Sequence, residues 1–313
     1  MDKNYRSYII TFYHIHAKSY YIYFNMGLLM FALFSIHPSL SMACVGARPL
    51  GMGGAFIAVA DDANVPYWNP AALALMQKRQ ATGMFTADDD INYKNFVSYS
   101  QALDDQFAAA ASIYTWRDRF LGYLPQGDPL ILENYSRPWV SLAYRMSTAR
   151  SGAMALGANL SFGQGKLARP MRNIEYSTKI GVGLDLSFLY RHDKHWSFGL
   201  LIQDINEPSI ESEELGYKID WMRNVRPGVA YRPNEQLLIA FDVYDFFDEE
   251  LRKLMLGVEY DVDEEWSVRG GIYGLSEIDW PTVGGTYRFN PDFSLEASLM
   301  DFEVFILSAT YAF

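Results

Sequence analysis

Alternation of apolar and polar residues with a period of two is the feature that most restricts the fold of this chain. It is clearest at the C-terminus, where Phe305, Leu307, Ala309, Tyr311 and Phe313 fall on one face and Ile306, Ser308, Thr310 and Ala312 fall on the other. Successive side chains of a β-strand point to opposite faces, so this spacing predicts a strand. The chain ends on an aromatic residue within that strand.

Similar segments follow one another from about residue 78 to the C-terminus, with turn residues between them and no helix-length apolar periodicity. Each predicted strand pairs an apolar or aromatic face with a small, polar or charged face. The sequence therefore predicts an all-β fold of about fourteen strands, near residues 78–86, 92–101, 106–116, 138–147, 152–163, 174–190, 195–205, 222–232, 236–245, 252–261, 265–274, 279–289, 292–299 and 303–313.

Alternation alone does not separate a soluble sandwich, which buries its apolar face, from a transmembrane barrel, which turns that face to lipid. Three observations favour an antiparallel transmembrane β-barrel over the soluble alternative. The strand number is even, short turns alternate with long connections (roughly 117–137, 164–173 and 206–221), and aromatic residues gather at strand ends. Aromatic girdles at the membrane interfaces then account for an aromatic content of 16%.

The N-terminus has the plan of a secretory signal peptide. An apolar stretch follows Met26, Pro38 interrupts it, and small residues stand at Ser41 and Ala43. We predict a leader and signal peptide over residues 1–43, with an uncleaved anchor as the alternative. Cys44 follows the expected cleavage site, but Ser41 stands where a lipobox has Leu, so we expect an unmodified thiol. A secreted barrel of this kind is expected in the bacterial outer membrane, with residues 78–313 forming its wall.

Residues 44–77 differ in composition, because they are rich first in Gly and then in Ala and show no clean alternation. A barrel of this size has a lumen too wide for its own side chains to fill. We therefore predict that residues 44–77 form an N-terminal plug. Asn69 followed by Pro70 predicts the start of a short helix, with Asn as its N-cap.

Within this segment, residues 48–64 read RPLGMGGAFIAVADDAN and residues 67–71 read YWNPA. This block resembles the opening of the FadL/TodX-type outer-membrane proteins, and particularly their PorV/PorQ-like branch. The resemblance implies a plugged barrel that carries hydrophobic molecules such as fatty acids or aromatic hydrocarbons, or, in the PorV-like branch, one that serves protein secretion. The plug residues that it implies are Gly51, Gly53, Gly54, Asp61, Asp62, Asn69, Pro70 and Ala71. The chain lacks the long outer loops of the fatty-acid transporters, which argues against a fatty-acid substrate.

Two further sets are candidate functional residues. The alternation places the charged residues Asp185, Arg226, Asp242, Glu259, Arg269, Arg288 and Glu296 on the lumen face. We expect them to pair across strands and with the plug, the alternative being a polar conduction path. The predicted loop 117–137 carries an apolar cluster of Phe120, Leu121, Tyr123, Leu124, Leu130, Ile131 and Leu132. Such a cluster suits access for a hydrophobic ligand, a docking surface for a partner, or a lid.

Motifs for enzyme chemistry are weak. Gly51-Met-Gly-Gly lacks a βαβ context, and His192 with His195 has no third metal ligand in sight. The acidic runs at 88–90 and 248–250 fit solvated loops better than calcium sites. No Ser/His/Asp arrangement can be inferred, so we expect no enzyme, no cofactor and no bound metal. A net charge of −11 disfavours nucleic acid.

The expected function is passive uptake or capture of small hydrophobic molecules, and the alternative is a PorV-like accessory role in protein secretion or surface assembly. The expected partners are outer-membrane lipid, a hydrophobic ligand, a secretion-system partner under the alternative, and the barrel-assembly machinery. Terminal aromatic residues such as Tyr311 and Phe313 are the assembly signal that such machinery reads.

Overall fold

The computed structural model describes residues 45–313 except 88–93, 118, 126, 147–151 and 276–278. The predicted leader 1–43, Cys44 and the acidic run 88–90 lie outside the described residues. In this part of the chain, no helix is both long and apolar enough to cross a membrane.

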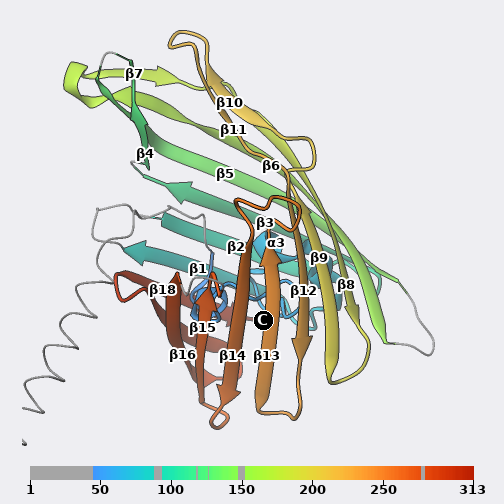
Figure 1. Ribbon diagram of the computed structural model, residues 1–313. Helices are drawn as coiled ribbons and strands as arrows, with labels where there is room; N and C mark the ends of the chain where they lie inside the picture. The colour runs from blue at the N-terminus through green and yellow to red at the C-terminus, as the bar shows by residue number, and fades with distance from the viewer. Residues whose placement is uncertain (1–44, 88–93, 118, 126, 147–151, 276–278) are drawn as a thin grey trace, which may run out of the picture. The chain divides into compact units, whose positions relative to one another are not determined.

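Antiparallel pairing joins the strands into one large sheet that closes on itself (Figure 1). The sheet has 16 strands, of which β4 and β7 are short additions at its edges, and the pairing of β5 with β6 closes the remaining fourteen into a ring. The strands are β1 (Gln80–Ala87), β2 (Lys94–Ala102), β3 (Phe107–Trp116), β4 (Arg119–Tyr123), β5 (Pro129–Met146), β6 (Ala153–Arg169), β7 (Ile174–Ser177), β8 (Gly181–Arg191), β9 (Trp196–Gln203), β12 (Asn224–Tyr231), β13 (Leu237–Tyr244), β14 (Lys253–Asp261), β15 (Trp266–Tyr273), β16 (Trp280–Asn290), β17 (Phe293–Met300) and β18 (Val304–Ala312). The prediction of a 14-stranded antiparallel β-barrel is confirmed.

The faces of the barrel follow the predicted alternation. In β18, the outward side chains Phe305 and Tyr311 are 46% and 47% exposed, whereas the inward Ile306 and Ser308 are buried. The pairing of β1 with β18 joins the first strand of the wall to the last, with Gln80 opposite Ala312. Apolar side chains therefore cover the outside of the ring, and a mixture of small, polar and buried apolar side chains lines the inside.

The prediction that residues 117–137 form an irregular loop is wrong. The segment contains β4, and β5 begins at Pro129, well before the predicted start at 138. The physical reason is a register shift between Glu133 and Ser136, where Asn134 adopts a positive φ of 48°. The shift breaks the period-two pattern, so the upstream half of β5 does not align in sequence with its downstream half.

Two other predicted boundaries also differ. The predicted strand 174–190 divides into β7 and β8, and the predicted loop 206–221 holds a hairpin of β10 (Ser209–Ser212) and β11 (Tyr217–Asp220). β6 continues to Arg169, through part of the predicted loop 164–173, and a 3-10 turn, η2 (Pro170–Arg172), follows it. Backbone hydrogen bonds between neighbouring segments form these additional strands. Such pairing cannot be predicted from the residue composition of a segment.

The two ends of the barrel are different. One end, here called the short-turn rim, holds the connections after β2, β8, β12, β14 and β16. The opposite end, the long-loop rim, holds β4, β7 and the β10–β11 hairpin, which lie at the upper side of Figure 1.

Residues 45–75, here called the interior segment, contain α2 (Ala47–Gly51), α3 (Val65–Trp68) and the 3-10 helix η1 (Pro70–Leu75). α2 packs against β15 to β18, whereas η1 packs against β2, β3, β5, β6 and β8. A buried segment that contacts strands on opposite sides of a closed ring lies inside it. Asn69 accepts a hydrogen bond from the backbone N–H of Ala71 at 3.2 Å, so the predicted N-cap of η1 is present.

Close approach between the interior segment and the wall depends on glycine. A Cβ atom on Gly157 of β6 would lie 2.2 Å from the backbone N of Ala71. Gly53 adopts a φ of +62°, and a Cβ atom there would lie 2.6 Å from the backbone N of Ile272. A side chain at either position would push the interior segment away from the strands.

Candidate functional site

A charge network joins the interior segment to the wall near the short-turn rim. Arg48 contacts Glu259 of β14 through Nη2–Oε1 at 2.8 Å and Nε–Oε2 at 2.9 Å. The same guanidinium reaches Asp61 at 2.5 Å and Asp62 at 3.2 Å. Arg269 of β15 lies 3.2 Å from Glu259 on its other side. Such charge-assisted contacts fix both the position and the orientation of α2.

Asp61 has a strongly shifted pKa. Burial by itself raises the pKa, but the positive charges of Arg48 and Arg232 outweigh burial and hold it at about 2. Burial raises the pKa of the adjacent Asp62, and the charge of Arg48 only partly offsets this. Asp61 is therefore ionised over the whole physiological pH range.

Two open cavities flank Asp61 on the side of the short-turn rim. One, of about 320 Å³, is lined by Arg48, Glu259 and Arg288 among others, and the second, of about 410 Å³, is lined by Arg191 and His195 among others. Asp61 and Arg232, which are 3.2 Å apart, border both cavities. Residues of the interior segment thus line both cavities.

Asp242 of β13 holds the middle of the interior segment. Its Oδ2 accepts hydrogen bonds from the backbone N–H groups of Phe56 at 2.6 Å and Ile57 at 2.7 Å. The residue is only 1% exposed, so the contact is shielded from water. One buried carboxylate oxygen therefore satisfies two backbone donors that no helix or strand satisfies.

A third network lies towards the long-loop rim. Asn159 of β6 donates to the backbone O of Pro66 at 2.7 Å and to Asp185 at 2.9 Å. Asp185 accepts the backbone N–H of Asp204 at 2.8 Å, and the side chain of Asp204 is paired with Arg137 of β5. This chain of contacts connects α3 with the connection that leads to the β10–β11 hairpin.

Aromatic and basic side chains gather next to this network. The ring of Trp116 has the Arg119 guanidinium 4.7 Å and the Lys94 ammonium 5.0 Å from its centroid. Tyr135 stacks on Trp221 with the ring centroids 5.6 Å apart. Flat aromatic faces beside cations suit an aromatic or amphipathic guest.

The predicted lumen residues do not form one cluster. Glu259, Arg269 and Glu296 lie together near the short-turn rim, and Arg288 pairs with Asp261 at 3.1 Å at that rim. The remaining three are Asp242, Asp185 and Arg226. Arg226 donates to Gln203 at 2.8 Å and lies over the ring of Tyr244. All seven except Arg288 are buried. Glu259 and Asp242 contact the interior segment directly, whereas Asp185 reaches it only through Asn159.

The predicted plug residues all lie in the interior segment. Gly51, Gly53 and Gly54 pack against β15 and its neighbours, and Asp61 and Asp62 bind Arg48. Pro70 begins η1, and the backbone N–H of Ala71 also donates to Ser187 of β8 at 2.8 Å.

The prediction that the apolar residues of 117–137 form one exposed patch is wrong. Phe120 and Tyr123 are 54% and 73% exposed, but Leu130 and Leu132 are each 1% exposed. Leu121, Leu124 and Ile131 are half-buried. The reason is that the residues after Pro129 belong to a strand with one buried face, not to a solvated loop.

Residues that sequence reasoning missed include Arg137, Asn159, Asp204 and Trp221. Arg137 and Asp204 are 6% and 3% exposed, so both side chains are buried inside the barrel. The burial of Arg137 could have been predicted from the sequence, because in a strand that begins upstream of residue 138 it lies on the same face as the buried Trp139 and Ser141.

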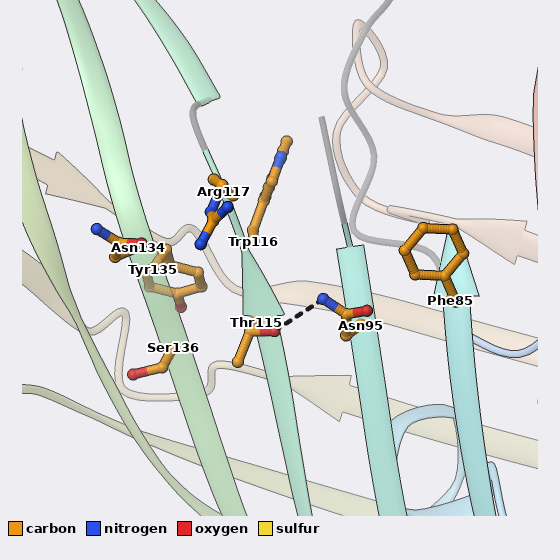
Figure 2. A pocket seen from close by; sticks show the side chains of 8 residues that line it. All are labelled: Phe85, Asn95, Thr115, Trp116, Arg117, Asn134, Tyr135 and Ser136. Atoms are coloured by element: carbon orange, nitrogen blue, oxygen red, sulfur yellow. Dashed lines mark hydrogen bonds between the residues drawn. The ribbon is translucent and has the colours of Figure 1, made fainter. Parts of the chain in front are cut away.

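A further cavity of about 490 Å³ lies between the ends of β1, β2 and β3 and the register shift within β5 (Figure 2). Within the part of the chain that the structure describes, no group of three or more His, Cys, Asp or Glu side chains is arranged to hold a metal ion.

No protein-family model matches the chain, and no curated protein matches its sequence. Its fold, however, matches solved structures over nearly their whole length. A FadL homologue of Pseudomonas aeruginosa has a TM-score of 0.63 at 12% identity, with 86% of this chain and 98% of that chain covered. The monoaromatic hydrocarbon channel CymD has a TM-score of 0.62 at 14% identity, with 88% and 99% covered.

The toluene transporter TodX of Pseudomonas putida has a TM-score of 0.57 at 12% identity, with 88% and 99% covered. CymD is named as a channel, TodX as a transporter and the third neighbour as a FadL homologue, and none of the three is named as an enzyme. At such low identity the match concerns architecture alone. The chain therefore has the 14-stranded barrel fold found in FadL-type hydrocarbon channels.

Proposed function

We propose that this protein is a bacterial outer-membrane channel for the passive uptake or capture of small hydrophobic molecules. The interior segment would be its plug, and movement of that plug would open the passage. The observation that carries the proposal is the position of residues 45–75, which are largely buried and contact strands on opposite sides of the ring. The fold of hydrocarbon channels supports it, as does an outside covered by apolar side chains.

The path would begin at the long-loop rim. Trp221 stacks there on the buried Tyr135, and the network from Arg137 to Asn159 leads from this level to α3. A guest that displaced Trp221 from Tyr135 would disturb the same network. We infer that loading at the rim and loosening of the plug are linked in this way.

A reversible lock tests the proposal. The backbone N–H of Ala47 donates to Ser308 Oγ of β18 at 2.9 Å, so cysteines at these two positions would tie α2 to the wall. The variant is Ala47→Cys with Ser308→Cys, made with Cys44→Ser to remove the native thiol. Uptake of labelled toluene by whole cells is measured before and after reduction of the disulfide.

Uptake should be low in the oxidised variant and should recover on reduction, while the Cys44→Ser parent should not respond to the reductant. Equal uptake in both redox states would show that the plug need not move. Wild-type cells that take up toluene no faster than cells without the protein would contradict the proposed transport.

The secretion-accessory role implied by the resemblance of residues 48–71 is the alternative. Affinity purification from gently solubilised membranes separates the two functions. A stoichiometric protein partner would favour the accessory role, and a co-purified hydrophobic small molecule would favour transport.

A further inference from the structure

The 490 Å³ cavity beside β1, β2, β3 and β5 is lined in part by outward-facing residues of the wall, and we call it the wall groove. It is lined by Phe85, Asn95, Thr115, Trp116, Arg117, Asn134, Tyr135 and Ser136 (Figure 2). In the sheet register, Phe85 is opposite Asn95, Asn95 is opposite Thr115, and Thr115 is opposite Ser136. These four residues alternate with the buried Thr86, Phe96, Trp116 and Tyr135, so they form one outward-facing row across four strands.

The row runs from the apolar part of the outer surface to a polar part. Its continuation in one direction is Leu307, opposite Phe85, and in the other direction Gln164, opposite Ser136. One step towards the short-turn rim, the outward residues are Val97 and Ile113, which are 56% and 40% exposed. In a membrane, the wall groove would therefore lie where the hydrocarbon region meets the headgroups on the long-loop side.

The polar groups in the wall groove have few partners in the protein. Asn95 Nδ2 donates to Thr115 Oγ1 at 3.5 Å, which is the outer limit of a hydrogen bond. Among the described residues, the side chains of Asn134, Ser136 and Arg117 make no hydrogen bond or ion pair with one another or with the rest of the protein. Polar side chains on the lipid side of a barrel are costly unless a polar molecule meets them.

We propose that the wall groove binds the phosphorylated sugar headgroup of a membrane glycolipid. The Arg117 guanidinium supplies the paired donors that match a phosphate. The amides of Asn95 and Asn134 and the hydroxyls of Thr115 and Ser136 can exchange hydrogen bonds with sugar hydroxyls. Phe85, 43% exposed at the apolar end of the row, offers an aromatic surface to the sugar ring or to the acyl chains. The inference rests on the proposed membrane location but not on the proposed cargo.

Native mass spectrometry of the detergent-purified barrel tests the inference with a defined lipid. The probe is a bisphosphorylated, acylated glucosamine disaccharide, titrated against its dephosphorylated form and against phosphatidylethanolamine. The bisphosphorylated form should bind most tightly. Arg117→Gln should weaken its binding about tenfold, because a hydrogen bond to a charged group is lost.

Arg223→Gln is the matched control, because Arg223 is also an exposed arginine beyond a strand end on the long-loop rim, with a side chain 53% exposed. It should bind the probe as the wild type does. Thr115→Val, which keeps the shape of the side chain and removes its hydroxyl, is the second variant and should weaken binding of both the bisphosphorylated and the dephosphorylated sugar lipids. Heat-dependent mobility on gels confirms that each variant is folded.

Equal binding of phosphatidylethanolamine and the glycolipid would overturn the inference, as would an Arg117→Gln variant indistinguishable from Arg223→Gln. Toluene uptake is a separate readout. A wild-type protein that takes up toluene but does not bind the glycolipid would overturn the headgroup site alone, whereas a wild-type protein that binds the glycolipid without taking up toluene would support the site and contradict the transport function.

Discussion

Arg48 of the interior segment forms a bidentate salt bridge with Glu259 of the barrel wall. The contacts are 2.8 Å and 2.9 Å long, and the two side chains are 15% and 4% exposed. The residues are 211 positions apart in the sequence, so the bridge depends on the tertiary fold and not on local structure. It joins the interior segment directly to β14.

Removing one partner of this bridge should loosen the interior segment. In Glu259→Gln, the buried guanidinium loses its charged partner on the wall, which typically costs about 3 kcal/mol in the free energy of unfolding. The measurement is detergent-resistant thermal unfolding, together with the rate of trypsin cleavage after Arg48.

Asp292→Asn is the control, because the Lys78–Asp292 pair at 2.7 Å has side chains 47% and 48% exposed. It should change the free energy of unfolding by less than about 1 kcal/mol. Equal effects of the two substitutions would contradict the structural role assigned to Arg48 and Glu259.

Asp242→Ala should release the backbone near Phe56. The substitution leaves the buried N–H groups of Phe56 and Ile57 without the acceptor that both share, and each orphaned donor costs about 1–3 kcal/mol. Amide hydrogen exchange of peptides that cover residues 55–58 should become much faster. Asp242→Asn keeps an acceptor oxygen and should give an intermediate rate; unchanged protection in Asp242→Ala would refute the anchoring role.

Gly157→Ala should displace η1, since the new Cβ atom would lie 2.2 Å from the backbone N of Ala71. We expect a destabilisation of about 1–3 kcal/mol, as for other overpacked interiors. Gly83→Ala is the matched control, because Gly83 also lies in a strand but has no atom within 4 Å of the position of a Cβ. Thermal unfolding that affects both variants equally would mean that η1 does not pack on β6 in this way.

The alternation of residues such as Leu256 and Glu259 was sufficient to predict the fourteen-stranded ring and the faces of strands such as β14 and β18, because a period of two is a local property of the chain. It also predicted the even strand number and placed Asp242 on the inward face of β13. The local signal at Asn69 and Pro70 predicted the start of η1, since capping depends on adjacent residues.

The register shift and the long-range ion pairs could not be predicted from local sequence patterns. The register shift at Asn134 reverses the parity of β5, so Leu130 and Leu132 looked exposed although they are buried. The pairing of Arg137 with Asp204 joins residues 67 positions apart, and no spacing rule connects them. Which charged residues meet is decided by ring closure, not by local pattern.

Phe313→Ala should reduce the yield of assembled barrel. The backbone N–H of Phe313 donates to the O of Arg79 at 2.8 Å, and its ring lies edge-on to Tyr311 and Tyr99. The residue is 62% exposed, so its loss should affect recognition during assembly more than stability of the finished barrel. The heat-modifiable fraction in isolated membranes measures this. A normal fraction would contradict the assembly-signal prediction for Tyr311 and Phe313.

Acid should weaken the attachment of the interior segment through Asp61. Although burial raises its pKa, Arg48 and Arg232 hold the folded-state value at about 2, below the ordinary 3.8. A depressed carboxyl pKa contributes stability above the unfolded-state value, at most about 2 kcal/mol here, and that contribution is lost as the pH falls from about 4 to 2. The melting temperature of wild type should therefore exceed that of Asp61→Asn at pH 5 and approach it at pH 2. A constant difference across this range would show that ionisation of Asp61 does not stabilise the attachment of the interior segment.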